Sequence, residues 1–500
     1  METHGLFIDG EEQPAQSGAT YSSINPANGQ VWAHFAAASG ADVDAAVAAA
    51  KRAHDAGVWR NKSPAERAEI LRRVADLITD HHMDLVMAEI QDSGGTMRKG
   101  NGADIMGANM SFGQHAEFCE ALELEQATQE FFPIEATNII RREPVGVVAA
   151  IIPFNFPFAA ASWKVAPALA AGCTLVLKPS PHTPATALMM AKICSEAGVP
   201  PGVINVLTGP DPELGAALVA HPDVNKVSFT GSTSVGKQVM KSCADRVTNC
   251  LLELGGKSAT IILDDADLDI AVPGAIFGTF FHSGQVCESG TRILVSNDLH
   301  DEFVERLKAE MENVIVGDPM DMDTTVGPLV SEGQRQTTER YVQSLIDEGA
   351  TLLFGGKRPE HCDPNGFYYE PTAFTDVRAE MTGACEEIFG PVVVIQRYSD
   401  QDEAIRIANT SIYGLGGSVW SRDLERATEV ARLMETGTVW INDYHLINPK
   451  YPFGGYKQSG LGRELGLQGL DGYFETKHIH VGQSSTRTDK HYLSMILKEG

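Results

Sequence analysis

The sequence predicts an α/β fold built from two domains, because two kinds of segment alternate along most of its length. Short apolar segments of strand length are separated by longer segments of helical composition, and this alternation is typical of parallel βαβ units. It runs through residues 145–263 and resumes through residues 291–442, so we place a divide near residue 256. A chain of 500 residues is long enough for each domain to bury its own core.

The first part of the chain is expected to form helices before the strands begin. Residues 42–56 and 64–91 are rich in Ala, Leu and Glu. Ser63 can cap the second of these helices and Pro64 suits its first position. Glu66, three residues after Ser63, can complete a capping box.

Strand-like segments follow from residue 145 onward. Residues 145–152 read VGVVAAII, a continuous apolar run as in a strand that is covered on both faces. Further strands are expected at 174–180, 203–208, 226–232 and 259–263, with helices between the earlier ones, for example at 184–197 and 211–220. In the second half, strands are expected at 291–296, 391–398, the GGSVWS segment and 437–442, and helices at 301–311, 402–409 and 423–434.

Composition argues against several classes of partner. The formal net charge of −27 repels nucleic acid phosphates and anionic membranes, so neither is an expected partner. No apolar run has the length of a membrane span, and the N-terminus METHGLFIDG lacks the pattern of a signal peptide. The eight cysteines have neither paired nor metal-like spacing, so we expect free thiols, a cytoplasmic location and no metal site.

The segment FTGSTSVGKQ at residues 229–238 has the composition of a phosphate-binding turn. Gly231, Gly236 and the lysine after it match a P-loop, but Gln238 stands where that motif needs a magnesium-binding Ser or Thr. A helix is expected to begin near Ser232, and backbone N–H groups at a helix start favour a phosphate. A triphosphatase is therefore disfavoured, and an ordinary glycine turn is the remaining alternative. The usual GxGxxG fingerprint of a Rossmann turn is absent.

Four further residues stand in segments that suit chemistry. Cys287, in SGQVCESG, suits a nucleophile, the alternative being a buried inert thiol. Glu253, among leucines, suits a general base whose pKa is raised by desolvation, the alternative being a solvated strand end. Asn155, between two prolines, suits an oxyanion donor unless the turn is merely structural. Lys178 can reach a ribose or phosphate unless it is a solvated surface lysine.

Taken together, these segments resemble the aldehyde dehydrogenase superfamily in its NAD(P)-dependent, non-acylating form. The matching motifs are PFNFP, LKPS, FTGSTSVG, LELGGKS, GQVCESG, EEIFGPV and PFGGYKQSGLGRELG, in the family's order and spacing over roughly residues 6 to 481. The resemblance implies an oxidoreductase that converts an aldehyde into a carboxylic acid with NAD(P)+, through a cysteine thiohemiacetal and a thioester.

The resemblance also implies two Rossmann-like parallel-sheet domains plus a small β oligomerisation arm. The nucleotide-binding domain, the catalytic domain and the arm would comprise residues 1–125 with 145–255, residues 256–455, and residues 126–144 with 475–482. Members of the family are usually homodimers or homotetramers. The tail at 484–500 receives no role.

Family roles carry over to the matching positions of this chain. Cys287 matches the nucleophile, Glu253 the general base, Asn155 the oxyanion amide and Glu464 a second carboxylate that relays protons in some members. Lys178 matches the lysine at the adenosine ribose. The other cofactor positions are the lining residues Ile152 and Phe154, the pyrophosphate turn with Gly231, Ser232, Val235 and Gly236, and Glu387 and Phe389 at the nicotinamide riboside.

One departure from the family pattern concerns the choice of cofactor. Pro181 stands where a glutamate often binds the adenosine ribose hydroxyls. Without that carboxylate a ribose 2′-phosphate is not repelled, yet no nearby arginine favours it. We therefore expect NAD, with NADP left open.

The same matching predicts the walls of a substrate tunnel. Its members are Phe156, Ala160, Trp163, Phe281, Ile447 and Phe453. Aromatic side chains would form the walls, and the modest size of Ala160 and Ile447 predicts a wide tunnel. Because no Arg or Lys is among them, apolar aliphatic or aromatic aldehydes are expected to be preferred over semialdehyde acids.

Two other functions share these motifs. A CoA-acylating dehydrogenase would use the same thiol but usually lacks a base at the Glu253 position. A catalytically silent homologue would keep the fold only, and the intact Cys287, Glu253 and Asn155 argue against it.

Overall fold

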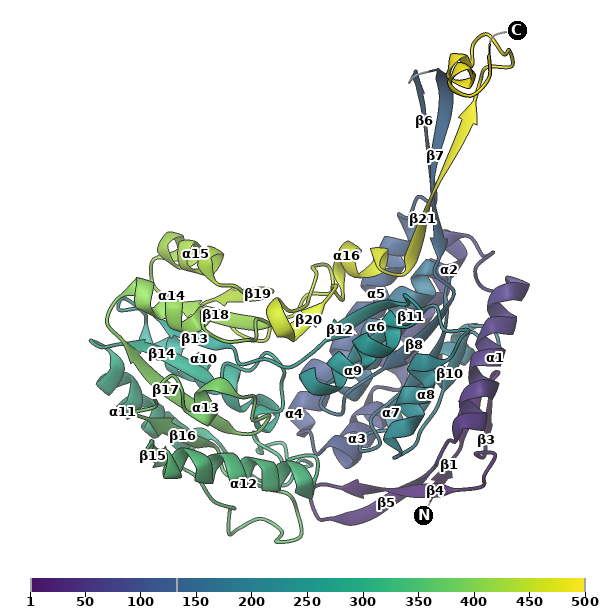
Figure 1. Ribbon diagram of the computed structural model, residues 1–500. Coiled ribbons are helices and arrows are strands. Elements are labelled where there is room, and N and C mark those ends of the chain that lie inside the picture. The colour runs from purple at the N-terminus through teal and green to yellow at the C-terminus, as the bar shows by residue number, and fades with distance from the viewer. Residues whose placement is uncertain (1, 132–133, 499–500) are drawn as a thin grey trace.

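The computed structural model describes residues 2–131 and 134–498, which form two α/β lobes and a projecting arm (Figure 1). The first lobe is built on an eight-stranded sheet and the second on a seven-stranded sheet. Both sheets have parallel centres flanked by helices, so the predicted α/β class with two parallel sheets is confirmed. The last strand of the first sheet's parallel centre ends at Glu253 and the second sheet begins at Ala259.

The first sheet has the strand order β20-β12-β11-β8-β9-β10-β2-β3. Its parallel centre comprises β8 (Val147–Ile151), β9 (Thr174–Lys178), β10 (Ile204–Val206), β11 (Lys226–Thr230) and β12 (Asn249–Glu253). Consecutive strands are joined by α6 (Pro157–Ala171), α7 (Ala185–Ala197), α8 (Pro212–Ala220) and α9 (Thr233–Ala244). The central strands are buried on both faces, which explains their continuous apolar sequences.

Helices cover both faces of this sheet and enclose two apolar cores. On one face α6 and α7 pack with α2 (Pro64–Asp80), α3 (His82–Ser93) and α5 (Ile105–Glu120). On the other face α8 and α9 pack with α1 (Gly40–Ala56). The short α4 (Met97–Lys99) and a π-helical turn, η1 (Gly100–Asp104), lead into α5.

Residues 351–354 and 372–375 of the second sheet form strands that were not predicted from the sequence. The same is true of several short strands of the N-terminal segment and of the first sheet. They are β1 (Thr3–His4), β2 (Leu6–Ile8), β3 (Glu11–Gln13), β4 (Thr20–Asn25), β5 (Gln30–Ala36) and β20 (Gly460–Leu461). The strands β2 and β20 add antiparallel edges to the parallel centre, and β1, β5 and β4 form a separate small sheet. Their sequences are too short or too polar to show the alternation of apolar and polar residues that is typical of a strand. Their strand conformation therefore depends on pairing with other strands.

The second sheet has the strand order β15-β16-β17-β14-β13-β18-β19. Its strands are β13 (Ala259–Ile262), β14 (Arg292–Ser296), β15 (Thr351–Phe354), β16 (Thr372–Thr375), β17 (Val392–Tyr398), β18 (Gly416–Trp420) and β19 (Thr438–Ile441). The helices are α10 (Leu268–Phe280), α11 (His300–Glu310), α12 (Glu332–Asp347), α13 (Thr382–Cys385), α14 (Gln401–Asn409) and α15 (Leu424–Leu433), with 3₁₀ turns η2 (Phe281–Gly284) and η3 (Met311–Asn313).

The arm is a three-stranded antiparallel sheet of β6 (Glu125–Phe131), β7 (Glu135–Pro144) and β21 (Phe474–Gly482). It projects from the first lobe, and the tail with η5 (His491–Met495) lies near its tip (Figure 1). The chain reaches β21 through η4 (Lys457–Ser459), β20 and α16 (Gly466–Asp471). Residues 132 and 133 of the predicted arm, and residues 1, 499 and 500, lie outside the described residues.

The prediction of one helix over residues 64–91 was wrong. The structure divides it at His81, whose φ of −92° and ψ of 12° end α2 and precede α3. Both segments have helical composition, so the break reflects tertiary packing more than local propensity. The predicted capping box is confirmed, since Ser63 Oγ accepts from the Glu66 N–H and the Glu66 carboxylate accepts from the Ser63 N–H.

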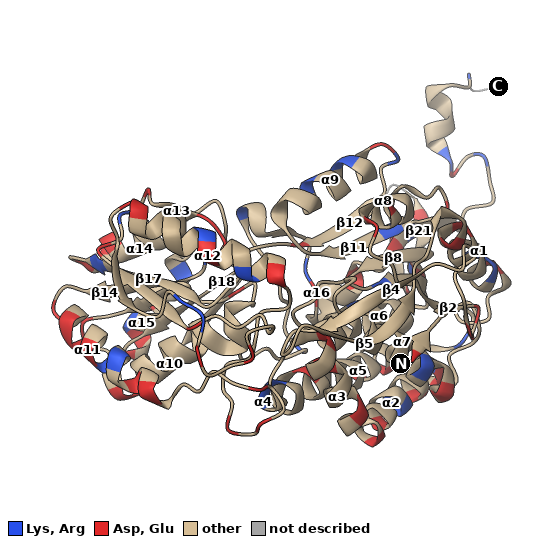
Figure 2. Cartoon of the chain, turned by 90° about the horizontal axis from the view of Figure 1, so that it is seen from below, with Lys and Arg blue, Asp and Glu red and all other residues tan. Residues whose placement is uncertain are grey.

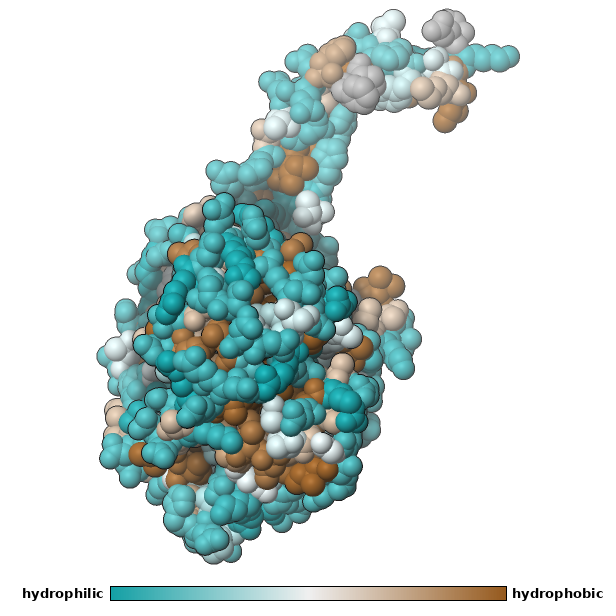
Figure 3. Space-filling view, turned by 90° about the vertical axis from the view of Figure 1, so that its left-hand side faces the viewer, coloured by the Kyte–Doolittle hydropathy of each residue, from teal (hydrophilic) through white to brown (hydrophobic). Residues whose placement is uncertain are grey.

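Charges of both signs alternate on the surface helices (Figure 2). On α12, for example, Arg335 lies within ion-pair distance of both Glu332 and Glu339. Seen from the end of the second lobe, the surface is largely hydrophilic with scattered apolar patches, and the arm rises behind it (Figure 3). Among the described helices, none combines the length and apolar character needed to span a membrane.

Candidate active site

A cavity of about 360 Å³ is lined by residues from both lobes. Every residue predicted for catalysis or for the substrate tunnel lines it, namely Asn155, Phe156, Ala160, Trp163, Glu253, Phe281, Cys287, Ile447, Phe453 and Glu464. The sequence places the first and last of these residues, Asn155 and Glu464, more than three hundred positions apart. Their convergence on one cavity is therefore an independent result of the fold, and its volume is in the range of small-molecule sites.

Cys287 lies in the loop between η2 and β14 and is a half-buried residue that borders the cavity. Its Sγ donates a hydrogen bond to Glu288 Oε2 at 3.1 Å. Burial raises the pKa of the Cys287 thiol well above its ordinary value, and the charge and hydrogen bond of Glu288 raise it further.

Asn155 is held beside this loop by the rigid turn between β8 and α6. Its side chain is 4% exposed, and Nδ2 donates to the Gln285 carbonyl oxygen at 2.8 Å. An amide nitrogen carries two hydrogens, so this bond orients the group and leaves the second hydrogen for another acceptor. The turn thus presents a fixed donor at the cavity wall.

Glu253 ends β12 inside the cavity and is not the solvated strand end that was the alternative. It is 3% exposed, and neither carboxylate oxygen has a hydrogen-bond partner among the described residues. Burial and the nearby Glu464 carboxylate raise the pKa of Glu253 well above its ordinary value. Such a carboxyl group is a stronger base than an exposed glutamate once it is ionised.

Glu464 reaches the same cavity from the segment between β20 and α16. Its Oε1 accepts a hydrogen bond from Lys164 Nζ at 2.6 Å, and both side chains are buried. Lys164 Nζ also donates to Ser228 Oγ at 3.1 Å. A buried charge is stable only when it is paired, so Lys164 and Glu464 support each other.

Aromatic rings form two walls of the cavity. Trp163 and Phe453 meet edge-to-face with ring centroids 5.3 Å apart. Phe156 and Phe281 pack at 6.0 Å with a tilted geometry. Ala160 and Ile447 also line the cavity and are half-buried.

The predicted phosphate turn joins β11 to α9. Ser232 caps α9, with Oγ accepting from the Val235 N–H, and the Val235 side chain is 43% exposed. A Cβ at Gly231 would approach the Phe229 ring at 2.7 Å, and one at Gly236 would approach Leu254 at 2.4 Å. A larger residue at either position would therefore require the Phe229 ring or the Leu254 side chain to shift, so glycine suits both positions.

Three predicted cofactor residues lie at the ends of β8 and β9. Ile152 directly follows β8, Lys178 ends β9, and Pro181 comes three residues later. Lys178 is 8% exposed rather than a solvated surface lysine, and burial lowers its pKa to about 8. Its Nζ donates to the Pro179 carbonyl at 3.3 Å. Ile152 is buried and its N–H donates to the Lys178 carbonyl, while Pro181 is half-buried.

Glu387 approaches the first lobe from the second. Its Oε1 accepts from the Gly256 N–H at 3.0 Å, and burial raises its pKa to about 7. Phe389 meets Phe154 edge-to-face at 5.5 Å, so these two predicted cofactor residues contact each other across the lobes. Phe389 has a φ of 56°, a strained conformation for a bulky residue.

The sequence did not reveal part of the cavity lining. From η1 and α5, the lining includes Gly102, Ala103, Met106, Gly107 and Met110. Elsewhere it includes Thr230, Glu288, His445, Leu446, Asn448 and Pro449. The apolar face of α5 gave no functional signal, because a methionine on a helix is usually core. Glu288, directly after Cys287, is a charged residue that the sequence shows beside the predicted nucleophile, but no function was predicted for it.

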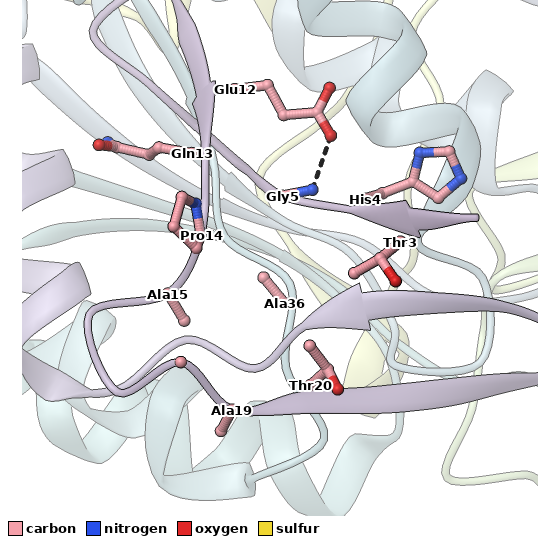
Figure 4. A pocket seen from close by; sticks show the side chains of 11 residues that line it. Thr3, His4, Gly5, Glu12, Gln13, Pro14, Ala15, Ala19, Thr20 and Ala36 are labelled. Atoms are coloured by element: carbon pink, nitrogen blue, oxygen red, sulfur yellow. Dashed lines mark hydrogen bonds between the residues drawn. The ribbon is translucent and has the colours of Figure 1, made fainter. Parts of the chain in front are cut away.

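A second pocket, of about 480 Å³, is lined by residues 3–36 of the N-terminal strands (Figure 4). Glu12 accepts there from the Gly5 N–H at 2.6 Å, and the remaining labelled side chains are mostly small. None of the residues predicted for catalysis or cofactor binding lines it.

Comparison with known proteins identifies the family. The model of the "Aldehyde dehydrogenase family" matches residues 13–479. A betaine aldehyde dehydrogenase of Bacillus subtilis is 43% identical over 478 residues, covering 95% of this chain and 96% of the relative. A peroxisomal aminoaldehyde dehydrogenase 2 of Pisum sativum is 41% identical and covers 96% of each chain.

Solved structures of aldehyde dehydrogenases have the same fold as this chain over almost its whole length. The betaine aldehyde dehydrogenase of Staphylococcus aureus in complex with NAD+ has a TM-score of 0.94 and 40% identity, covering 96% of this chain and 95% of that one. An NAD-dependent aldehyde dehydrogenase of Sinorhizobium meliloti has the same TM-score and identity, covering 97% and 95%. With the family model matching nearly the whole length, this chain belongs to the aldehyde dehydrogenase family.

Proposed function

We propose that this protein oxidises an aldehyde to a carboxylic acid with NAD+, through a thiohemiacetal and a thioester on Cys287. One observation carries the proposal: a thiol, a fixed amide donor and an unpartnered buried carboxylate line the same cavity. Cofactor reduction by purified protein with an aldehyde, in the absence of CoA, tests it. Turnover that requires CoA would instead support the acylating alternative.

In the first step the Cys287 thiol loses its proton to solvent, and its sulfur forms a bond to the aldehyde carbon. The π bond of the carbonyl group breaks, and its electron pair gives the oxygen negative charge. The free hydrogen of Asn155 Nδ2, together with the Cys287 backbone N–H, would hold that oxygen. One such donor in a buried site stabilises the transition state by about 3–4 kcal/mol. Splitting the oxidation at a covalent intermediate makes each half easier.

The residues around the α9 start fit a dinucleotide. The glycine turn and the N–H groups of the first turn of α9 would hold the pyrophosphate, Lys178 the adenosine ribose, and Glu387 the nicotinamide ribose. Phe154 and Phe389 would flank the nicotinamide. When bound, the nicotinamide accepts the hydride that protein side chains cannot accept.

Glu253 would then act on water to hydrolyse the thioester. Its carboxylate has no competing hydrogen-bond partner among the described residues, so both oxygens are available to a water molecule. Glu464, paired with Lys164, would pass the proton onward. A base at this position supports hydrolysis over transfer to CoA.

We propose that the three parts of the chain have the separate functions that the family resemblance implies. Residues 1–125 with 145–255 would bind the nucleotide, 256–455 would supply the nucleophile, and the arm would join two or four copies. Exposed Ile140, Ile479 and Val481 on the arm support burial against another copy. We propose a cytoplasmic location, as the spacing of the eight cysteines in the sequence led us to expect.

We propose that the substrate carries no negative charge. Carboxylates of Glu253, Glu288 and Glu464 line the cavity, whereas no Lys or Arg does among the described residues. Relatives named for betaine aldehyde and aminoaldehydes favour a cationic ammonium tail, which the faces of Trp163 and Phe453 would attract. The largely apolar lining, with Met106 and Met110, supports the apolar aldehyde as a second candidate.

The charge of the substrate gives the first prediction. We expect kcat/KM for betaine aldehyde and for octanal to exceed that for succinic semialdehyde by about 100-fold, because carboxylates repel an anionic tail. Steady-state assays of the three aldehydes with NAD+ measure this. A preference for succinic semialdehyde would contradict both candidates, and the ratio of the other two chooses between them.

The cofactor gives the second prediction. We expect kcat/KM for NAD+ to exceed that for NADP+ by about tenfold or more, because a 2′-phosphate needs a charge-assisted partner that Pro181 cannot provide. Lys178, which we propose at the adenosine ribose, is the nearby cation, and burial lowers its pKa to about 8. Equal efficiencies with the two cofactors, assayed at one pH, would show that Lys178 accommodates the phosphate.

A further inference from the structure

Cys287 is followed directly by an acidic residue that is buried against it. Glu288 is 4% exposed, and its Oε2 accepts the hydrogen bond from Cys287 Sγ at 3.1 Å. Its other oxygen, Oε1, lies 3.0 Å from His445 Nδ1. The Glu288 backbone is fixed as well, because the Tyr444 hydroxyl donates to its carbonyl at 2.8 Å. One carboxylate thus bridges the thiol and an imidazole.

The surroundings of His445 determine where protons lie. Its Nε2 is 3.1 Å from the Gly278 carbonyl oxygen, which can only accept, so Nε2 carries a hydrogen. Its Nδ1 faces Glu288 Oε1, another acceptor, so one more proton must lie between these atoms. One hydrogen shared between Nδ1 and Oε1 satisfies both of these atoms.

Aromatic rings fix the imidazole in this position. Tyr444 meets it edge-to-face at 4.7 Å, and Phe277 does so at 5.3 Å. The side chain of His445 is 4% exposed, and its φ of 58° is a strained conformation that the packing maintains. The pair is therefore a built element of the site.

We propose that Glu288, kept ionised by His445, acts as a latch that holds Cys287 in its protonated, unreactive form. The proposal rests on the proposed role of Cys287 as the nucleophile and makes Glu288 and His445 positioning residues for it. The carboxylate accepts the S–H hydrogen, which stabilises the thiol, and repels the negative charge of a thiolate. The latch opens when the S–H bond breaks and its proton passes to solvent water, the electron pair remaining on sulfur as a thiolate.

Electrostatics around the thiol supports this direction. Burial and three carboxylates, those of Glu288, Glu387 and Glu253, raise the pKa of Cys287. Burial opposes ionisation of Glu288, but the hydrogen bond and charge of His445 outweigh it and hold the pKa of Glu288 below its ordinary value. Glu288 is therefore a weak acceptor for the thiol proton, and its negative charge opposes the thiolate.

Alkylation of Cys287 by iodoacetamide, without aldehyde or cofactor, tests the latch. The rate is measured against pH by peptide mass spectrometry, which separates Cys287 from the other cysteines. We expect Glu288→Gln to alkylate about tenfold faster than the wild type at pH 7, because removing the anion lowers the thiol pKa by about one unit. We expect the kcat/KM profile of the variant to shift toward lower pH in parallel.

Two matched variants separate the latch from a general loss of structure. His445→Asn keeps a donor near the Nδ1 position but carries no charge, so Glu288 takes up a proton and alkylation again accelerates. Glu387→Gln removes another carboxylate near the thiol. Because the Glu387 carboxylate accepts from the Gly256 N–H and not from Cys287 Sγ, we expect this variant to accelerate alkylation less than Glu288→Gln does. A merely structural role for His445 would leave the alkylation profile of His445→Asn unchanged.

The opposite sign overturns the proposal. Slower alkylation of Glu288→Gln would mean that Glu288 and His445 remove the thiol proton, as a base and its charged partner. Equal rates in Glu288→Gln and the wild type would mean that Glu288 does not control the thiol. Aldehyde oxidation by the wild type is assayed separately, so failure of the latch and failure of the proposed function give different results.

Discussion

Cys287→Ala is expected to abolish aldehyde oxidation, with kcat/KM reduced by at least about 10⁴-fold. The methyl group of alanine cannot form the bond to the aldehyde carbon, and no other thiol lines the cavity among the described residues. The remaining donors can hold a carbonyl oxygen, but no covalent intermediate forms. Production of reduced cofactor, followed by its absorbance, measures the loss.

Cofactor binding provides the control for this variant. The proposed nucleotide contacts come from the turn at Gly231–Gly236, Lys178 and Glu387, none of which involves the sulfur. Calorimetric titration with NAD+ should therefore give a Kd within about threefold of the wild type. Substantial oxidation by Cys287→Ala would remove the thiol from the mechanism, whereas lost NAD+ binding would indicate a disturbed fold.

Glu253→Gln is expected to slow steady-state turnover by about 100-fold or more while preserving the first turnover. An amide cannot accept the proton of water, so the thioester accumulates after hydride transfer. Rapid mixing should show a burst of reduced cofactor, close to one equivalent per site, followed by the slow phase. A lost burst would place Glu253 before hydride transfer.

The pH dependence of hydrolysis follows from the environment of Glu253. Burial raises its pKa well above the ordinary value, and the base must be ionised to act on water. The rate of the slow phase in the wild type should therefore rise as pH rises through this elevated pKa. In Glu253→Gln that rise should disappear, which single-mixing experiments over a pH series can measure.

The fold class and the cavity were predictable from the sequence for identifiable reasons. Strands such as β8 and β9 are continuous apolar runs because both of their faces are covered, and that pattern is readable without any partner. Cys287, Asn155 and Glu253 stand in segments whose glycines, prolines or leucines already limit what the polar residue can do. In the structure all three line one cavity, and their roles stay predictions.

The remaining features depend on partners far along the chain. The break at His81 has no glycine or proline to mark it, and the edge strands β2 and β20 are too short for a period to appear. The Lys164–Glu464 pair joins residues 300 positions apart, and neither one alone indicates the other. The bridge from Glu288 to His445 spans two loops in the same way.

The return of the chain to the first lobe has a consequence for biosynthesis. Strand β20 completes the edge of the first sheet beside β12, and Glu464 then neutralises the buried ammonium of Lys164. A nascent chain that has not yet reached this segment holds an uncovered strand edge in an otherwise complete sheet and an uncompensated cation on α6. Such long-range closure is slow, so a ribosome-bound intermediate should be retained by chaperones until the final tenth of the chain emerges.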